Sequence, residues 1–341
     1  MICLQKTGPN AKPLSPNKNH RQIQRVTSAT VLFCVLLLAF SSSSRSSLRG
    51  AHELHLNPQC SALKQFRICS HQLLDPPENQ VVGSLKAMSA FWAKGIKCFD
   101  IDAVTTKDGQ LLASHPVRLI PRISPNNSQN FDSAAYTLEE MRKLGADKEG
   151  YPLLYTVFEH YASLVNNEAT KKPFYAKGSN YLEGPLFNVD LKGPNLTAKH
   201  MDDILDKLVD LGIRDNVAIC ANPLKEGEIG PGVDMLKHVG PNPSRGNVGL
   251  VLRDREDNDR NIAKVKGTVQ SNPSIRSYVA SYKFEKDYFS KIRGMPIIAW
   301  TIDTAETLSY AIENGAAGIV TNHPIRLLNI LQGWIEKDQC T

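Results

Sequence analysis

Residues 97–109 decide the fold, and they read KCFDIDAVTTKDG. The first part of this stretch is largely apolar except for Asp100 and Asp102, and the stretch ends in Asp108-Gly109, a dipeptide typical of turns. Alternate side chains of a strand share a face, so the two aspartates lie together on one face. The pattern predicts a strand over 97–104 whose carboxylates line the interior of a barrel. A solvated edge strand is the alternative interpretation.

Seven further segments read as strands of the same kind, and each is a short run rich in apolar residues. They are Phe66–Ser70, Leu186–Leu191, Asn216–Ala221, Asn247–Arg253, Ser277–Tyr282, Pro296–Ile302 and Ala317–Thr321. Continuous apolar runs are typical of parallel strands that are covered on both faces. Eight such strands alternating with helical segments predict an α/β fold, a closed (β/α)8 TIM barrel. A doubly wound open sheet is the runner-up, but no glycine-rich phosphate loop follows the first strand.

Several of the intervening segments have the pattern of helices. We expect a helix over 79–94 that stops at Gly95, a helix capped by Thr197, and a helix opened by a capping box of Asp303 and Glu306. The stretch 116–185 between the second and third strands is too long for an ordinary connection. We predict that it is an insertion that passes over the mouth of the barrel.

The first 50 residues have a composition of their own. The chain of 341 residues carries a formal charge of +6, but residues 1–50 hold seven Lys or Arg and no acidic residue, which leaves 33 basic and 34 acidic residues in the rest. A near-neutral barrel domain, predicted over 60–335, gives no indication of a nucleic-acid surface. The apolar run 31–40 in this leader is too short to span a bilayer comfortably and is typical of a signal peptide. A retained signal anchor, or import into an organelle through the secretory route, are the alternatives.

The cysteines show no CxxC spacing, so a zinc–thiolate site is not predicted. Cys69, Cys98 and Cys220 fall inside predicted strands, where a buried, inert thiol is the commoner situation. Cys60 and Cys340 flank the predicted domain, and a bridge between them is a further hypothesis.

Polar side chains gather where the predicted strands end, and catalytic groups of TIM barrels lie at that edge. The candidates are His71, His115, Asp100, Asp102, Asp190, Lys192 and Trp300. Three carboxylates without a thiolate favour Mg²⁺ or Ca²⁺, and buried carboxylates repel one another unless a cation is present. Two histidines offer a general acid and a general base for phosphodiester cleavage. Taken singly, each histidine would more often be structural, Lys192 an exposed loop residue and Trp300 a core aromatic.

The same residues form a recognisable pattern. His71, Pro77-Glu78-Asn79, Asp100-Ile101-Asp102, Thr106-Lys107-Asp108-Gly109 and His115 resemble the signature of the glycerophosphodiester phosphodiesterase family. Asn188–Lys192, Ala299–Asp303 and Gly318–Pro324 resemble later strands of that family. The resemblance covers residues 66–330 and is thin over 217–290.

The resemblance implies a role for each candidate. His71 and His115 would be the acid–base pair, and Asp100, Asp102 and Asp190 would hold the divalent ion. Lys192 would contact the phosphate, and Trp300 would line the substrate mouth. The sequence departs from the family where Gln72 replaces an arginine, since a neutral amide cannot substitute for a bidentate cation. Further departures are a loop to Glu78 that is two residues shorter, aspartate for glutamate at two ligand positions, and Pro116 in place of an aspartate.

The function that we predict is metal-dependent hydrolysis of a glycerophosphodiester to an alcohol and glycerol 3-phosphate. A sphingomyelinase D-like phospholipase on the same barrel is one alternative, and a barrel that binds a phosphodiester without cutting it is another. The expected partner is a small-molecule or lipid-derived phosphodiester, with membrane association through the apolar leader segment.

Overall fold

The computed structural model describes residues 60–115, 132–192, 195–221, 236–239, 241–253, 259–283, 287–292 and 294–337. The predicted leader, Pro116, Cys340 and the side chain of Cys60 lie outside this part of the chain, so the hypotheses about them stay predictions. Within the described ranges, no helix combines the length and the apolar character that crossing a membrane requires.

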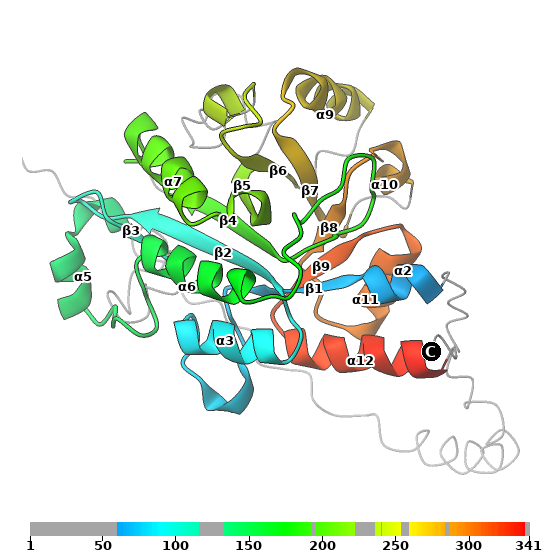
Figure 1. Cartoon of the computed structure of the whole chain (residues 1–341), viewed down its shortest axis with the longest axis horizontal. Helices are drawn as coiled ribbons and strands as arrows, with labels where there is room; N and C mark the ends of the chain where they lie inside the picture. The colour runs from blue at the N-terminus through cyan, green and yellow to red at the C-terminus, as the bar shows by residue number, and fades with distance from the viewer. Residues whose placement is uncertain are drawn as a thin grey trace, which may run out of the picture. The chain divides into compact units, whose positions relative to one another are not determined.

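The centre of the fold is a closed ring of eight parallel strands (Figure 1). The strands are β1 (Arg67–His71), β2 (Cys98–Thr105), β4 (Leu186–Lys192), β5 (Val217–Ala221), β6 (Asn247–Leu252), β7 (Ile275–Ser281), β8 (Ile297–Trp300) and β9 (Gly318–Thr321). Each pairs with the next, and β1 closes the ring by pairing with both β2 and β9. A short strand β3 (Leu111–Leu112) adds to β2 in the antiparallel direction. The predicted TIM barrel and its eight strands are therefore confirmed.

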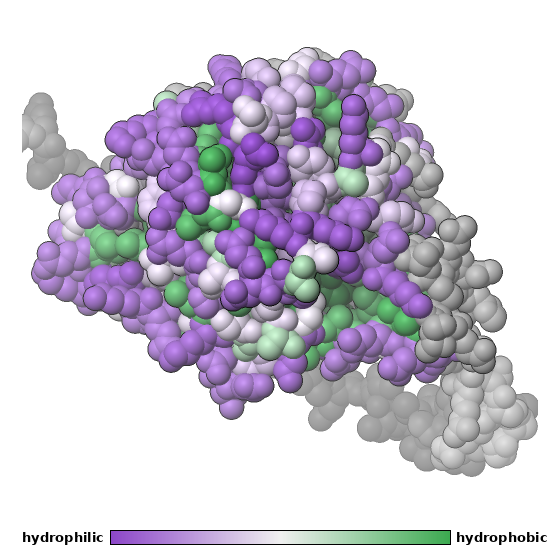
Figure 2. All heavy atoms as spheres, viewed as in Figure 1, coloured by the Kyte–Doolittle hydropathy of each residue, from purple (hydrophilic) through white to green (hydrophobic). Residues whose placement is uncertain are grey.

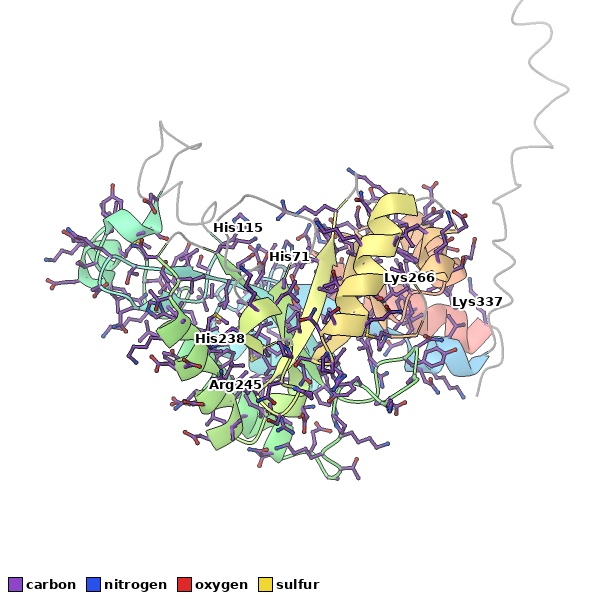
Figure 3. All side chains as sticks on the ribbon, turned by 90° about the horizontal axis from the view of Figure 1, so that it is seen from above. His71, His115, His238, Arg245, Lys266 and Lys337 are labelled. Atoms are coloured by element: carbon purple, nitrogen blue, oxygen red, sulfur yellow. A yellow bond between two sulfur atoms is a disulfide. The ribbon has the colours of Figure 1, made fainter. Side chains whose placement is uncertain are left out.

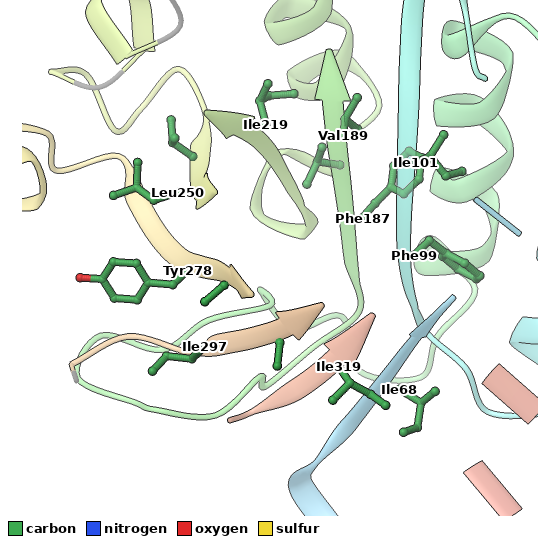
Figure 4. Close-up of a cluster of buried hydrophobic side chains, with 14 of the residues drawn as sticks. Ile68, Phe99, Ile101, Phe187, Val189, Ile219, Leu250, Tyr278, Ile297 and Ile319 are labelled. Atoms are coloured by element: carbon green, nitrogen blue, oxygen red, sulfur yellow. The ribbon is translucent and has the colours of Figure 1, made fainter. Parts of the chain in front are cut away.

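The outer face of the ring carries the main hydrophobic core. Figure 4 shows the side chains that point away from the barrel axis toward the helices, among them Phe99, Ile101, Phe187 and Val189. These residues occupy the odd-numbered positions of β2 and β4, so the aspartates at the even-numbered positions point inward. The apolar residues that point outward on each strand thus determine which of the other side chains point into the interior.

Helices surround the ring. They are α2 (Cys60–Gln65), α3 (Leu85–Ala93), α6 (Leu154–Asn166), α7 (Ala198–Asp210), α9 (Asp259–Ser271), α10 (Tyr288–Lys291), α11 (Ala305–Glu313) and α12 (Pro324–Lys337), with short 3-10 turns at Pro77–Asn79, Ser133–Ala135 and Arg214–Asn216. The Thr197 cap is confirmed, because its side chain accepts a hydrogen bond from the backbone of His200. The exterior seen in Figure 2 is mostly hydrophilic, with apolar side chains in limited areas.

Two predicted helix starts are wrong. The helix expected from Asn79 begins only at Leu85, because the Ser84 side chain accepts a hydrogen bond from Ala87 and caps it there. The helix expected to open with Asp303 is instead capped by Thr304, which forms a reciprocal pair with Thr307. The carboxylate of Asp303 is thereby left for contacts with the end of β9.

Of the stretch 116–185 that was predicted to pass over the mouth, 116–131 lie outside the described residues, so their path stays a prediction, and the described part contains two α-helices. Its first described helix is α5 (Leu138–Lys143), opened by a capping box of Thr137 and Glu140. The next, α6, packs against α3 and α7 and takes a place in the ring of helices around the barrel. Apolar residues on one face of α6, such as Phe158 and Tyr161, belong to the main core, which explains this position.

The interior near the amino ends of the strands is apolar and contains a disulfide. Cys69 and Cys98 are direct partners on β1 and β2 and form a disulfide bond, so the prediction that both are inert thiols was wrong. Cross-strand register, which the sequence alone does not give, is what brings the two sulfur atoms together. Phe174 and Leu182, from the connection before β4, pack against them. Cys220 is a buried free thiol, as predicted, and burial raises its pKa well above the ordinary value.

Candidate active site

The strand register brings most of the predicted site residues to the carboxyl end of the barrel. His71 is the partner of Asp100 across β1 and β2, and Asp102 is the partner of Asp190 across β2 and β4. Figure 3 shows His71 and His115 toward the same side of the ribbon, with His238 and Arg245 toward the other. His115, half-buried, lies just beyond β3.

Lys192 lies among the carboxylates. Its ammonium group forms an ion pair with Asp102, and a second at 3.3 Å with Oδ2 of Asp190. Burial acts to lower the pKa of Lys192, but Asp190 and Asp102 outweigh it and raise that pKa. Lys192 is therefore held as a cation, as a phosphate contact requires, although here it faces carboxylates.

Asp100 shows how crowded the negative charge is. Burial, followed by repulsion from Asp102 and Asp190, raises its pKa to about 8. The pKa of Asp190 is also raised, by burial first, while Lys192 and Arg253 act in the opposite direction. Three carboxylates thus share the interior with fewer balancing cations, and a divalent ion would relieve this repulsion.

The donor chemistry fits a hard divalent cation, because carboxylate oxygens are the ligands that Mg²⁺ and Ca²⁺ prefer. The described residues contain no group of three His, Cys, Asp or Glu side chains already arranged to hold a metal ion. An ion bound by Asp102 and Asp190 would compete with Lys192 for the same oxygen atoms. The assignment of Asp100, Asp102 and Asp190 as metal ligands therefore stays a prediction.

His71 is held from both sides of its ring. Its Nδ1 lies 2.7 Å from Oδ1 of Asn322, and its Nε2 lies 3.1 Å from Nε2 of Gln72. An amide nitrogen only donates, so Nε2 of His71 is the acceptor and Nδ1 carries the hydrogen. The histidine thus has no hydrogen on Nε2, as a general base requires, and this nitrogen accepts from Gln72.

Gln72 connects this histidine with the carboxylates. Its side-chain nitrogen also donates to Oδ2 of Asp102 at 2.5 Å, and the residue is buried with a positive φ of 51°. Non-glycine residues seldom adopt this conformation, which here directs the amide back into the barrel. Where the family has an arginine, this chain has a neutral bridge between two site residues.

Trp300 packs in part as a core aromatic, and its role at the substrate mouth stays a prediction. Its indole Nε1 donates to the backbone oxygen of Val279 at 3.1 Å, and the ring packs against the apolar interior cluster while remaining half-buried. It forms part of the wall at the carboxyl end of β8.

Sequence reasoning missed three residues near this site. Arg253 directly follows β6, is exposed, and has the parity of the inward-facing Gly249 and Val251. Its charge acts on Asp190, which places it near the carboxylates. The sequence feature that could have identified Arg253 is a cationic residue at the end of a predicted strand. Asn322 and Asp303, at the ends of β9 and β8, could have been noticed by the same criterion.

The fold is similar to that of known phosphodiesterases. No family model matches the chain, and no curated protein matches it. A glycerophosphodiester phosphodiesterase from Parabacteroides distasonis is 14% identical with a TM-score of 0.55, over 79% of this chain and 98% of that chain. The enzyme from Thermotoga maritima is 14% identical with a TM-score of 0.51, over 78% and 98%. A phosphodiesterase from Oleispira antarctica, solved with the product sn-glycerol-3-phosphate, is 12% identical with a TM-score of 0.52, over 80% and 99%. The family resemblance read from the sequence is thus confirmed at the level of the fold.

Proposed function

We propose that this chain is a phosphoric diester hydrolase that cleaves glycerophosphodiesters to an alcohol and glycerol 3-phosphate. The observation that carries the proposal is the contact series His71–Gln72–Asp102–Lys192–Asp190 at the carboxyl end of the barrel. It joins a histidine whose Nε2 carries no hydrogen and accepts from Gln72 to a cation and a carboxylate cluster. The fold shared with phosphodiesterases, one of them solved with glycerol 3-phosphate, supports the choice of substrate.

In this mechanism the attacking oxygen displaces the Gln72 amide nitrogen from Nε2 of His71, and His71 then accepts the proton there. His115 donates a proton to the leaving alcohol oxygen as the phosphorus–oxygen bond breaks. Lys192 and Arg253 bind the non-bridging phosphate oxygens, and Arg253 offers the forked guanidinium that position 72 lacks. A divalent ion, held by Asp100, Asp102 and Asp190, would neutralise charge on the phosphate.

The test is hydrolysis of glycerophosphocholine by the purified protein with Mg²⁺, with Ca²⁺ or with a chelator. Sphingomyelin and lysophosphatidylcholine are assayed alongside. We expect metal-dependent release of choline from the first substrate. Cleavage of the intact lipids alone would favour the phospholipase alternative. Binding of glycerophosphocholine without turnover would favour the binding barrel, for which Gln72 is the supporting observation.

Two substitutions test the acid–base pair. His71→Ala and His115→Ala should each lower kcat by roughly 10²–10⁴-fold, the range of general acid–base catalysis. His238→Ala is the matched control, because His238 bonds Asp202 at 2.8 Å outside the proposed site and should leave kcat unchanged. Wild-type turnover in either site variant would remove that histidine from the mechanism.

A further inference from the structure

A hydrogen-bonded series behind His71 is not explained by the roles assigned above. It runs from Asp303 through Asn322 to His71 and spans the ends of β8, β9 and β1, three neighbouring strands. We infer that Asp303 is a positioning residue that sets the tautomer of His71 by orienting the amide of Asn322. The inference rests on the proposed function only for the catalytic consequence.

The contacts of Asp303 leave little freedom. Its Oδ1 accepts from the backbone nitrogen of Asn322 at 2.8 Å and from Oγ1 of Thr321 at 3.0 Å. Its Oδ2 accepts from Nδ2 of Asn322 at 2.8 Å. The backbone between β8 and β9 supports this arrangement, because Ile302 donates to the carbonyl of Val320 at 2.9 Å. One carboxylate therefore fixes both the main chain and the side chain of Asn322.

Hydrogen-bond chemistry then determines the tautomer. An ionised carboxylate only accepts, so the amide of Asn322 must turn its nitrogen toward Asp303. Its oxygen must then face His71, where Oδ1 lies 2.7 Å from Nδ1. An amide oxygen only accepts, so Nδ1 of His71 carries the hydrogen and Nε2 keeps its lone pair. The orientation of Gln72, whose amide nitrogen faces Nε2, independently requires the same tautomer.

Asp303→Asn should reverse the direction of the hydrogen bond between Asn322 and His71 without leaving a cavity. The new amide keeps an oxygen for the backbone of Asn322 and presents a nitrogen to the Asn322 side chain. Two donors then face each other, so the amide of Asn322 flips and offers its nitrogen to Nδ1 of His71. The histidine must then carry its hydrogen on Nε2, so the Gln72 amide, whose nitrogen faces Nε2 in the wild type, has to turn as well. An Nε2 that carries a hydrogen cannot accept a proton.

The decisive measurement is ¹⁵N NMR of histidine-labelled full-length protein, with the His71 signals assigned by His71→Gln. We expect Nδ1 to be protonated in the wild type and Nε2 in Asp303→Asn, with kcat lowered by roughly 10²–10⁴-fold and KM little changed. A wild-type His71 protonated on Nε2 would overturn the inference whatever the variants do. An unchanged tautomer in folded Asp303→Asn would overturn it too.

A swapped pair separates positioning from general structural damage. In Asp303→Asn with Asn322→Asp, the carboxylate at position 322 accepts from both the new amide at position 303 and Nδ1 of His71. The double variant should regain the wild-type tautomer and most of the lost kcat, whereas failure to regain the tautomer contradicts the inference. Asp75→Asn is the control, because Asp75 accepts from His323 at 3.1 Å at the surface and should change neither readout.

These results also separate the two proposals. If the wild type hydrolyses no phosphodiester but His71 changes tautomer as expected, the positioning inference holds and the proposed function fails. If hydrolysis is found and the tautomer of His71 does not respond to Asp303→Asn, the proposed function holds and the positioning inference fails.

Discussion

Among the individual side chains, Asp100 carries the clearest electrostatic signal. Its pKa of about 8 in the folded protein lies above the ordinary 3.8 of the unfolded chain. The folded state therefore binds this proton more tightly, and the metal-free protein should lose stability as pH rises from about 4 to about 8. Asp100→Asn should remove that part of the loss. Thermal unfolding of the wild type and Asp100→Asn in chelator, at pH 5 and pH 8.5, measures this loss of stability. An identical decrease in Tm in both proteins would contradict the raised pKa of Asp100.

The raised pKa of Asp100 also predicts how metal binding responds to pH. Protons and a divalent ion compete for the Asp100 carboxylate, so Mg²⁺ or Ca²⁺ should raise Tm more at pH 8.5 than at pH 5. Asp100→Asn should give a small rise at both values. An equal rise in the wild type at the two pH values would mean that the ion does not use Asp100.

Arg253 tests whether a second cation replaces the arginine that is missing at position 72. Arg253→Ala should raise KM for glycerophosphocholine by about tenfold or more, since a charge-assisted hydrogen bond contributes about 1.5–3 kcal/mol. Arg253→Lys keeps the charge but not the forked guanidinium. Its KM should lie between those of the wild type and Arg253→Ala. Arg245→Ala, which removes a cation paired with Asp202 away from the site, is the control. Equal KM values for the Arg253 variants and the wild type would exclude a phosphate contact.

Sequence reasoning found most of the inward-facing residues because the period of a strand is two and catalytic groups of a barrel lie at strand ends. It missed the hydrogen-bonded series behind His71, because Asp303, the partner of Asn322, also fits a helix-capping pattern and nothing local shows that it turns toward β9. Capping by Thr304 releases Asp303 for that contact. Pairings between distant strand ends are decided by tertiary register, which a single sequence does not contain.

At the level of strands, the bond between Cys69 and Cys98 joins β1 to β2 two residues before His71 and Asp100. With a sequence separation of 29, the loop-closure model gives a stabilisation of about 3–4 kcal/mol. The double variant Cys69→Ala with Cys98→Ala should therefore lower the free energy of unfolding in urea by several kcal/mol. Cys220→Ala, which removes a buried thiol from the same barrel interior, should cost much less. Similar losses in the two proteins would show that the bond contributes little.

The barrel as a whole was predictable because eight apolar runs separated by helical segments leave few topologies open. The place of the described part of 116–185 was not, because length alone does not distinguish a flap over the mouth from a helix of the ring. The apolar face of α6 decided the matter for that helix by packing on the barrel, where Tyr161 contacts Phe99 of β2 and Phe158 contacts Phe187 of β4. Its pattern was visible in the sequence, but the surface that it covers was not.

We expect the leader to bind membranes and the barrel to carry out catalysis. Residues 1–50 hold seven basic residues and no acidic one, together with the apolar run 31–40, whereas the remainder is close to neutral. Basic segments bind anionic lipid by about 1 kcal/mol per residue, and salt screens this attraction. We expect the full chain to float with phosphatidylserine vesicles in low salt, and residues 51–341 to stay in solution with unchanged kcat. Equal flotation of both would place the membrane contact on the barrel itself, and lipid cleavage by the shorter protein would then have to be measured at that surface.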